Sequence, residues 1–519
     1  MVAVSVFWTA TCRSASPDNV VVMAKSLDDL ITLDPAEAFE FSGTEIIANL
    51  YDRLFVANPI NPTQPTLGLV ETWNLSDDGR TYEFLLKKGP TFQGGRSVSA
   101  ADAVFSIRRS VILNKTPAFI LSQLGFTPSN TETTARVIDD RRFILEVDRN
   151  YAPSLVLNVL SSAITSIVDR KTVLSNSSEG DLGNGWLRSN SAGSGPFRLR
   201  SWNVGEYVML DVNRDHPNAS QALERFVIRD IREPATQRLM LTRGDVDIVR
   251  DLAPDQIAAL AKEADIITWS APQARIFYMA LNQQNPILSV SEVRRAIRHA
   301  IDYKGIVRYL LPGRAEVHQA FLPKGFLGAL EETPFVFDLA RARELLADAG
   351  FDKKIPLSVD VRSDPLALQI AQAIQTSLSK IDIVLDIRPG DGRQVLTKYR
   401  ARRHNVYMGY WGPDYLDPHS NAAAFARNPD NDDDAVDKTL AWRNGWEISD
   451  LTRRTDEAIL IRDPKERAAA YEDLQRNLQM DSPFIVLFQE QALIATRENV
   501  SGLEVGLTSD QIRYERVSK

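Results

Sequence analysis

Cysteine and histidine, the residues that most often build disulfides and metal sites, are scarce in this sequence. Its 519 residues include one cysteine, Cys12, so an internal disulfide is excluded. The five histidines are scattered along the chain without the spacing of metal ligands: His216, His299, His318, His404 and His419. We therefore expect no metal site and no cofactor, and we expect the histidines to lie on the surface or to pack inside the protein.

Sequence signatures of catalysis, of membrane spans and of nucleic-acid binding are also missing. The sequence has no G-x-S-x-G motif, no P-loop and no H-E-x-x-H motif. No apolar run reaches the roughly 18 residues of a membrane-spanning helix. The net charge of −8 argues against a nucleic-acid partner, because such proteins normally carry a basic excess.

The first residues look like the end of a secretory signal peptide. The segment MVAVSVFWTATCRSA is mostly apolar, and small residues follow at Ser14–Ala15–Ser16. No lysine or arginine precedes Arg13, so either the start lies upstream or the segment is not a signal. Lipidation of Cys12 is the alternative, although no leucine stands where a lipobox requires one. We expect residues 1–18 to be a signal-peptide remnant and the protein to be periplasmic, free or tethered to the membrane.

Length and residue pattern predict an α/β protein of several units. The chain is long enough for roughly three units of about 150 residues, and it is 44% hydrophobic and 25% charged, as soluble globular proteins are. Predicted strands and helices follow one another in mixed order. Leu357–Val361 (strand), Pro365–Leu378 (helix) and Ile383–Ile387 (strand) predict a β-α-β unit with a parallel crossover.

Two helix starts are predicted from capping residues. Ser99 and Asp102 have the spacing of a capping box, in which each residue satisfies a free N–H of the other's backbone. Ser42 or Thr44 is expected to cap a helix over Glu45–Phe55, because a side-chain oxygen there accepts a hydrogen bond from an unpaired N–H.

One short stretch, YMGYWGPDYLDP at residues 407–418, concentrates aromatic rings and carboxylates. Val406–Trp411 predicts an apolar strand that Gly412–Pro413 ends. An ordered loop would then carry Trp411, Asp414 and Tyr415, and a fixed ring beside a carboxylate suits a polar ligand with an apolar body. The alternative is a strand-to-loop corner with a core tryptophan and a turn aspartate.

Several segments, in order along the chain, resemble extracytoplasmic solute-binding proteins of ABC importers, family 5, the peptide, nickel and oligopeptide-binding group. The matching segments are Leu75–Leu86 with Lys88–Gly89, Phe92 and Gly94–Gly95; Ala100–Ser106; Gly193–Phe197; Gly244–Ile248; Ala280–Asn282 with Val293–Ala296 and Ala300–Asp302; and Asp338 to Phe351. Each segment alone is a weak signal, but their order and spacing extend from about residue 20 to 505.

The resemblance implies a two-lobed periplasmic-binding-protein fold of type II, from the cluster with an extra subdomain, with a ligand cleft between the lobes. Residues 19–275 would form lobe I with the extra subdomain, residues 276–488 lobe II, and residues 489–519 a C-terminal return to lobe I. The strands Ile276–Leu281 and Pro483–Phe488 would cross between the lobes.

The resemblance also implies ligand-binding residues. In peptide-binding members the aspartate three residues after the motif tryptophan pairs with the ligand's α-amino group, and this position is Asp414, after Trp411. A desolvated ammonium needs such a fixed counter-charge. Tyr415 lies beside it on the same loop. Arg362 lies near the place of an arginine that holds a ligand carboxylate, with a surface arginine at a strand end as the alternative.

Phe41 and Ser42 fall near a loop of the first lobe that touches ligand in the resembling family. Their alternative role is the entry and cap of a helix. Gly412–Pro413 departs from several relatives, so the loop that carries Asp414 can lie differently here.

The implied function is capture of a peptide-like or other polar small solute by lobe closure, followed by delivery to a membrane permease. We expect a monomer without enzymatic activity. An opine or an oligosaccharide-type ligand is the alternative on the same fold. A more remote alternative is a hydrolase that uses Asp414 and Asp417 as paired carboxylates.

Overall fold

The structure is a computed structural model that describes residues 17–58, 61, 64–250, 252–435 and 437–519. Residues 1–16, which hold most of the predicted signal-peptide remnant and Cys12, lie outside the described residues. Among the residues that are described, no helix is long and apolar enough to cross a membrane.

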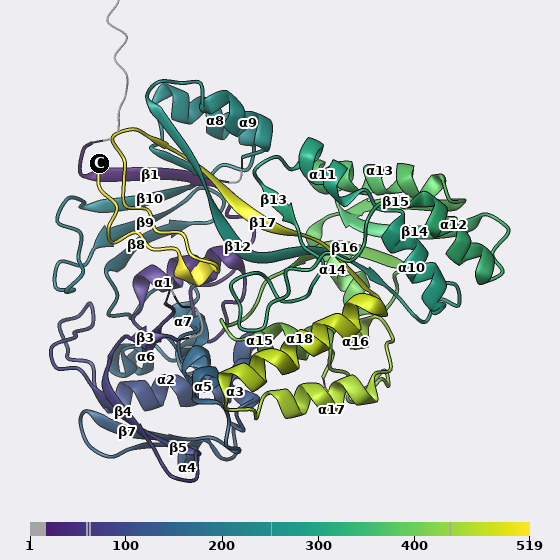
Figure 1. Cartoon of the computed structure of the whole chain (residues 1–519). Helices are drawn as coiled ribbons and strands as arrows, with labels where there is room; N and C mark the ends of the chain where they lie inside the picture. The colour runs from purple at the N-terminus through teal and green to yellow at the C-terminus, as the bar shows by residue number, and fades with distance from the viewer. Residues whose placement is uncertain (1–16, 59–60, 62–63, 251, 436) are drawn as a thin grey trace, which may run out of the picture.

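A large mixed sheet extends through both lobes of the molecule, and each half of the sheet belongs to one lobe (Figure 1). At its centre two long strands, β12 (Ile266–Leu281) and β17 (Phe484–Arg497), pair antiparallel. Beyond β17 the sheet continues through β11, β1, β10, β9 and β8, and beyond β12 it continues through β16, β14 and β15. Lobe I is built on the first of these halves and lobe II on the second, so β12 and β17 cross between the lobes.

The strands of the lobe I half are β1 (Val20–Lys25), β8 (Phe197–Asn203), β9 (Tyr207–Val212), β10 (Arg225–Asp230) and β11 (Ile248–Arg250). Those of the lobe II half are β14 (Ile355–Arg362), β15 (Ile383–Gly390) and β16 (Val406–Trp411), while β13 (Ala315–Val317) pairs with β17. The helices of lobe I are α1 (Phe41–Leu50), α2 (Ala100–Leu113), α3 (Phe119–Ser122), α4 (Thr131–Thr134), α5 (Pro153–Val159), α6 (Arg170–Ser175), α7 (Asn184–Leu187), α8 (Pro234–Arg243) and α9 (Pro254–Leu260). The helices of lobe II are α10 (Ser291–His299), α11 (Tyr303–Leu310), α12 (Leu339–Asp348), α13 (Pro365–Ser379), α14 (Gly392–Arg400), α15 (Pro418–Phe425), α16 (Leu440–Arg443), α17 (Ser449–Ala458) and α18 (Pro464–Met480).

Both crossing strands are longer than the predicted segments Ile276–Leu281 and Pro483–Phe488. Those segments match the parts of β12 and β17 that pair in lobe II, and the same strands continue as partners into lobe I. The register of the pair shifts between Pro272 and Ile276, close to the predicted boundary. The exact division into residues 19–275, 276–488 and 489–519 stays a prediction, because both boundaries fall inside continuous strands.

Lobe I contains a second sheet with a hydrophobic core of its own, as expected for the extra subdomain. The strands of this sheet are β4 (Val70–Leu75), β5 (Thr81–Leu86), β6 (Ala135–Val137) and β7 (Arg142–Glu146). A two-stranded ribbon, β2 (Phe55–Val56) and β3 (Thr66–Leu67), precedes them. Stacked rings of Tyr82, Phe84 and Phe143 form the centre of this core, which α2 and α5 cover.

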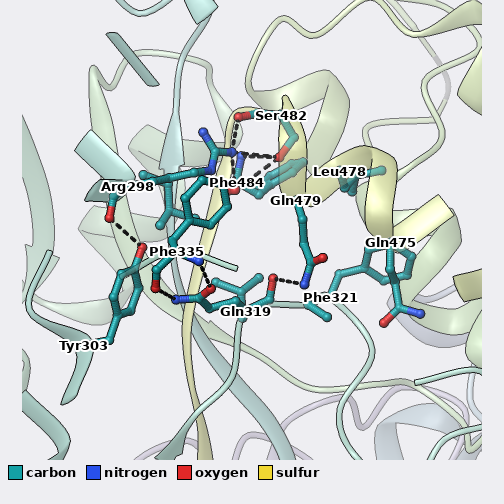
Figure 2. A pocket seen from close by; sticks show the side chains of 13 residues that line it. Arg298, Tyr303, Gln319, Phe321, Phe335, Gln475, Leu478, Gln479, Ser482 and Phe484 are labelled. Atoms are coloured by element: carbon teal, nitrogen blue, oxygen red, sulfur yellow. Dashed lines mark hydrogen bonds between the residues drawn. The ribbon is translucent and has the colours of Figure 1, made fainter. Parts of the chain in front are cut away.

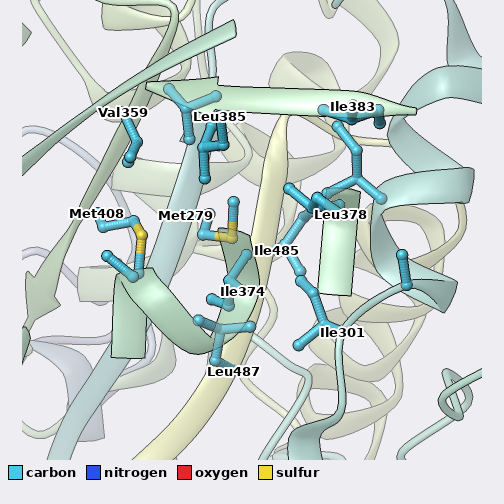
Figure 3. Packing of buried hydrophobic residues seen from close by; sticks show 14 of the residues in the cluster. Met279, Ile301, Val359, Ile374, Leu378, Ile383, Leu385, Met408, Ile485 and Leu487 are labelled. Atoms are coloured by element: carbon cyan, nitrogen blue, oxygen red, sulfur yellow. The ribbon is translucent and has the colours of Figure 1, made fainter. Parts of the chain in front are cut away.

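The β-α-β unit of lobe II is confirmed. β14 and β15 are parallel neighbours, and α13 connects them. Figure 3 shows how Ile374 and Leu378 of α13 pack with Val359 and Leu385 of the two strands in the core of lobe II.

The two predicted helix starts have different outcomes. The Asp102 carboxylate accepts hydrogen bonds from the Ser99 N–H (3.0 Å) and hydroxyl (2.6 Å), so the predicted capping box opens α2. The prediction that Ser42 or Thr44 caps a helix over Glu45–Phe55 is wrong, because the helix is α1 over Phe41–Leu50 and no side chain of its N-cap residue bonds it. The Ser42 N–H instead donates to the carboxylate of Asp29 at 3.1 Å, a partner from a preceding loop.

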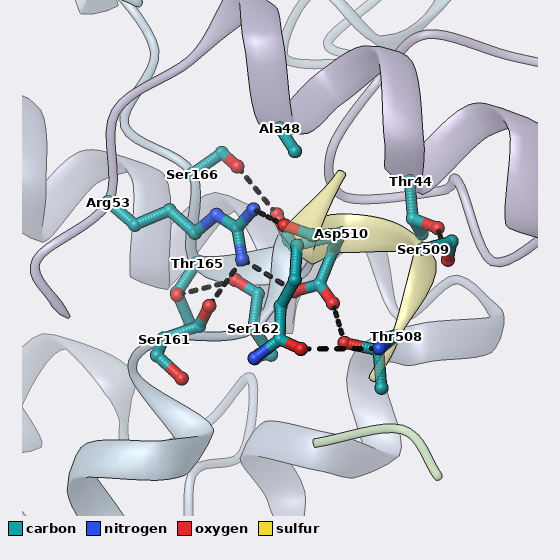
Figure 4. A network of polar contacts seen from close by, with 12 residues as sticks. Thr44, Ala48, Arg53, Ser161, Ser162, Thr165, Ser166, Thr508, Ser509 and Asp510 are labelled. Carbon is teal, nitrogen blue, oxygen red and sulfur yellow. Dashed lines mark hydrogen bonds and ion pairs between the residues drawn. The ribbon is translucent and has the colours of Figure 1, made fainter. Parts of the chain in front are cut away.

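The segment after β17 returns to lobe I and is fixed by polar contacts (Figure 4). The Arg53 guanidinium donates to the Asp510 carboxylate (2.6 Å) and to its backbone carbonyl (2.8 Å). The hydroxyls of Thr44 and Ser509 lie 2.7 Å apart. The Ala274 N–H donates to the Leu507 carbonyl at 2.7 Å, so the same segment also supports β12 near its register shift.

Candidate functional site

The C-terminal ends of three lobe II strands lie at one edge of the sheet. β16 runs parallel to β14, with Val359 opposite Val406, and β14 runs parallel to β15. The chain leaves β16 at Trp411, as the residue pattern predicts, and enters the helix α15 at Pro418. Arg362 and the loop that carries Asp414 therefore start from the same edge, which is where open α/β sheets bind ligands.

Trp411 is anchored in lobe II. Its indole N–H donates to the Asn421 side chain at 3.1 Å, and its ring meets Phe425 edge to face, with ring centroids 6.0 Å apart. The side chain is only partly buried. Its polar atom is thus occupied inside the lobe, and the ring is left as the part that can contact a solute.

Asp414 is a mostly buried carboxylate without a counter-ion. Its backbone N–H donates to the Ser420 hydroxyl at 2.8 Å, which fixes the loop. Burial raises the pKa of its carboxyl group to about 7, and no other group contributes to that rise. In the part of the chain that the structure describes, no ion pair or hydrogen bond satisfies this carboxylate.

Tyr415 connects the loop to lobe I. Its hydroxyl donates to the Gln123 side chain at 2.8 Å, and its ring is buried among the hydrophobic residues of the extra subdomain. Burial raises the pKa of the Tyr415 hydroxyl well above its usual range. With its ring and hydroxyl both engaged by lobe I, Tyr415 is a contact between the lobes.

Phe41 faces the same loop from lobe I, whereas Ser42 is buried. A Cβ added to Gly412 would lie 3.2 Å from the Phe41 ring, so this glycine allows the ring and the loop to approach. The guanidinium of Arg275 lies between Phe41 and Tyr410, at 5.3 and 4.8 Å from the two ring centroids. These cation–π contacts connect Arg275 of β12 to Phe41 of lobe I and to Tyr410 of lobe II.

Arg362 ends β14 and is exposed. A Cβ added to Gly392, the first residue of α14, would lie 3.2 Å from the Arg362 guanidinium, so this glycine makes room for it. No carboxylate partner of Arg362 is found within the described ranges.

Asp417 has a structural role that the residue pattern does not show. Its carboxylate accepts hydrogen bonds from both terminal nitrogens of Arg467, at 2.6 and 2.7 Å, and both side chains are buried. It also caps α15 by accepting from the His419 N–H at 2.9 Å. Burial opposes the charge of Arg467, but Asp417 outweighs burial and raises the pKa of Arg467. A carboxylate held in this way cannot share acid and base roles with Asp414, which removes the basis of the hydrolase alternative.

The structure also has a small pocket of about 20 Å³ in lobe II, and Asp414 is not among the residues that line it (Figure 2). The buried guanidinium of Arg298 borders it and donates to the Ser482 and Phe484 carbonyls at 2.7 and 2.9 Å. Burial lowers the pKa of Arg298 to about 10. A space of this size holds about one water molecule and no peptide-sized solute. Clusters of metal-ligating side chains are absent from the described residues.

Comparison with known proteins identifies the family. The model of the bacterial extracellular solute-binding proteins, family 5, matches residues 64–433. The chain belongs to this family. The family 5 match contains the whole of β12 and ends before β17.

Individual relatives cover nearly the whole chain. One is DdpA of Escherichia coli K12, named a probable D,D-dipeptide-binding periplasmic protein, which is 26% identical over 508 residues and aligns 96% of this chain with 94% of its own. The glutathione-binding protein GsiB of Salmonella choleraesuis is 23% identical over 497 residues, with 94% and 92% covered. Among solved structures, DppA of Helicobacter pylori in complex with the peptide STSA has a TM-score of 0.82 at 22% identity, with 96% of this chain and 98% of that chain covered. These family 5 relatives are solute-binding proteins, and the two-lobed fold predicted from the sequence is confirmed.

Two contacts at this site were missed from the sequence. Arg275 precedes the segment expected to be a strand, and the pattern carries no sign that its side chain lies between two rings. Tyr410 lies inside the stretch at residues 407–418, but strand alternation places it on the opposite face from Trp411. The pairing of β12 with β16 shows that Tyr410 lies opposite Phe277, which follows Arg275 by two residues on β12.

Proposed function

We propose that this protein binds a peptide-like solute with a cationic amine between its lobes and delivers it to the membrane permease of an ABC importer. It acts in the periplasm, without a catalytic step. Asp414 pairs with the amine, Trp411 contacts the apolar part of the solute, and Arg362 receives a carboxylate.

The observation that carries this proposal is the unpaired Asp414 carboxylate. A carboxylate removed from water costs several kcal/mol unless a counter-charge is supplied. Asp417, three residues later, has such a counter-charge in Arg467, but Asp414 has none among the described side chains. A solute ammonium would supply this counter-charge, so the cost of the unpaired carboxylate would be offset when the solute binds.

Tyr415 and Phe41 support a closure step. Both bring lobe I against the loop that carries Asp414, through the Tyr415–Gln123 hydrogen bond and the approach of Phe41 to Gly412. A solute that touches both lobes favours the closed arrangement by its differential affinity for it. The named solutes of the relatives, a D,D-dipeptide and glutathione, both carry an amine and a carboxylate.

The test begins with native mass spectrometry of the solute that copurifies with the protein. Calorimetry then measures binding of amine-bearing peptides to wild type and to Asp414→Asn. Truncation of one partner of a buried charge pair costs about 2–5 kcal/mol, so Asp414→Asn should weaken binding by roughly 30- to 4000-fold.

The matched control is Asp434→Asn, which removes the same charge from an exposed loop of lobe II. It should bind as wild type does. If Asp414→Asn also binds as wild type does, the amine is not held there. An opine or a hydroxyl-rich, oligosaccharide-type solute then becomes the better explanation, because an amide can replace a hydrogen-bonding carboxylate.

A further inference from the structure

Three arginines of lobe II come from elements that meet near the stacked rings of Tyr399 and Tyr407. Arg362 ends β14, Arg400 ends α14, and Arg443 ends α16. In the described parts of the chain none of the three has a carboxylate within ion-pair distance. Like charges close together repel one another, and a bound anion would relieve that repulsion.

One ring contact and the helix α14 place these arginines near one another. The Tyr399 ring is stacked on the Tyr407 ring, with centroids 4.0 Å apart. The Arg443 guanidinium lies 5.4 Å from the centroid of Tyr399, and its Nε is buried without a hydrogen-bond partner. Arg400 follows Tyr399 directly, and Arg362 lies against the first turn of the same helix, α14.

The charges of the three arginines act on the same groups. Burial and the neighbouring Tyr399 raise the pKa of Tyr407, and Arg443, Arg362 and Arg400 oppose that rise. Burial and then Arg443 lower the pKa of Arg400, which is the effect of a like charge nearby. These three positive charges therefore share one neighbourhood.

Nearby carboxylates do not neutralise the cluster. Glu40 of lobe I acts on Arg400 from a distance but forms no ion pair with it among the described residues. Asp360, on the same strand as Arg362, is already paired with Lys398 at 2.6 Å. The Glu40 interaction also indicates that Arg400 faces lobe I.

We propose that Arg362, Arg400 and Arg443 form an anion-binding face opposite lobe I, and that the solute carries at least two carboxylates at the end remote from its amine. This inference rests on the proposed function and extends it from one carboxylate contact to a class of acidic, amine-bearing solutes. Asp414 lies beyond Trp411, whose Cα is about 13 Å along β16 from that of Tyr407 at 3.3 Å per residue. The two ends of the solute are thus recognised by opposite charges at separate places.

The first experiment uses peptide pairs that differ by one charge. Calorimetry compares Ala-Glu with Ala-Gln, and Ala-Ala-Glu with Ala-Ala-Gln, in the L and the D series. Each pair has nearly the same shape, and only the glutamate peptide carries a second carboxylate. Wild type should bind the glutamate peptide about 10- to 100-fold more tightly, the range of one charge-assisted hydrogen bond. Arg400→Gln and Arg443→Gln should each reduce this preference at least severalfold.

The second experiment uses glutarate, a dicarboxylate without an amine, at constant ionic strength. Glutarate should raise the thermal unfolding midpoint of wild type and should raise that of the two arginine variants less. Without ligand, Arg400→Gln should be at least as stable as wild type, because it relieves repulsion between like charges. Arg403→Gln is the matched control, since this exposed arginine on the following loop is not among the charges that act on Tyr407.

The inference is overturned if glutarate fails to stabilise wild type, if glutamine and glutamate peptides bind equally, or if the preference survives in both variants. Failure of the proposed function gives a different result. In that case Asp414→Asn binds each peptide as wild type does, while glutarate still stabilises wild type through the arginines.

Discussion

Asp414 and Asp417 lie three residues apart, yet the structure surrounds them in opposite ways. Asp417 begins α15 and is held by both terminal nitrogens of the buried Arg467. Asp414, on the loop before that helix, is partly buried without a cationic partner among the described residues, and burial raises its pKa to about 7. The first carboxylate is satisfied within the fold. The second is left unsatisfied at the edge of the sheet where we propose that the solute binds, which is the difference expected between a structural group and a binding group.

The largest effect that would test this comparison is on stability. Asp417→Asn keeps a side chain able to cap α15 but leaves Arg467 buried without its counter-charge. Breaking one partner of a buried ion pair costs about 3–5 kcal/mol. Urea-induced unfolding, followed by circular dichroism, should show a free energy of unfolding lower by about that amount.

The double variant Asp417→Asn/Arg467→Met is the control for this prediction. It removes both charges, so it should lose less stability than the sum of the two single variants. An Asp417→Asn protein that unfolds at the wild-type urea concentration would show that the pair contributes nothing, and the contrast with Asp414 would then fail.

The role of Asp417 was not predictable from the sequence, whereas the position of the loop after β16 was. The strand 406–411 and its end at Gly412–Pro413 follow from local residue chemistry, and so does the capping box of α2. Arg467 lies fifty residues after Asp417 in α18, and no local pattern links the two. The position of Ser42 was also set by a residue outside its own segment. Ser42 lies inside α1 rather than at its cap, and its N–H donates to Asp29 from a preceding loop.

The crossing strands show the same limit on a larger scale. The apolar parts of β12 and β17 in lobe II are evident from the sequence. The continuation of β12 through Pro272 is not, because proline donates no hydrogen bond to a sheet and normally ends a predicted strand. The strand continues because its partner β17 pairs with β12 on both sides of the register shift. The arginine cluster was missed likewise, since Arg362, Arg400 and Arg443 come from three separate elements.

A smaller effect, on pH dependence, would sharpen the contrast between the two aspartates. Because the pKa of Asp414 is raised to about 7, its carboxyl is largely protonated at pH 5.5 and largely ionised at pH 7.5. An ammonium solute needs the ionised form, so its affinity should fall on the order of tenfold from pH 7.5 to pH 5.5. Calorimetry at both pH values, with one amine-bearing peptide, measures this change.

The groups around Asp414 do not account for such a change. Burial lowers the pKa of His419 to about 3, and burial raises the pKa of Tyr415 well above its usual range, so neither changes charge in this interval. Asp417 is held by Arg467. Asp414→Asn should therefore bind weakly and with little pH dependence. A variant that keeps the full wild-type pH dependence would assign the titration to another group.

The smallest effect concerns the contact between the lobes rather than the charge on the loop. Tyr415→Phe removes the hydroxyl that donates to Gln123 at 2.8 Å and keeps the buried ring. One such hydrogen bond contributes about 0.5–1.5 kcal/mol, so affinity should fall by about 2- to 10-fold, because the closed arrangement is less favoured. The loss should be equal for every peptide and at every pH, since no charge is altered. A double-mutant cycle with Gln123→Met separates this contact from others, and the second substitution should add little to the first. A loss that depends on solute charge would instead place the Tyr415 hydroxyl beside the solute, and the division between a closing residue and a binding residue on this loop would then have to be redrawn.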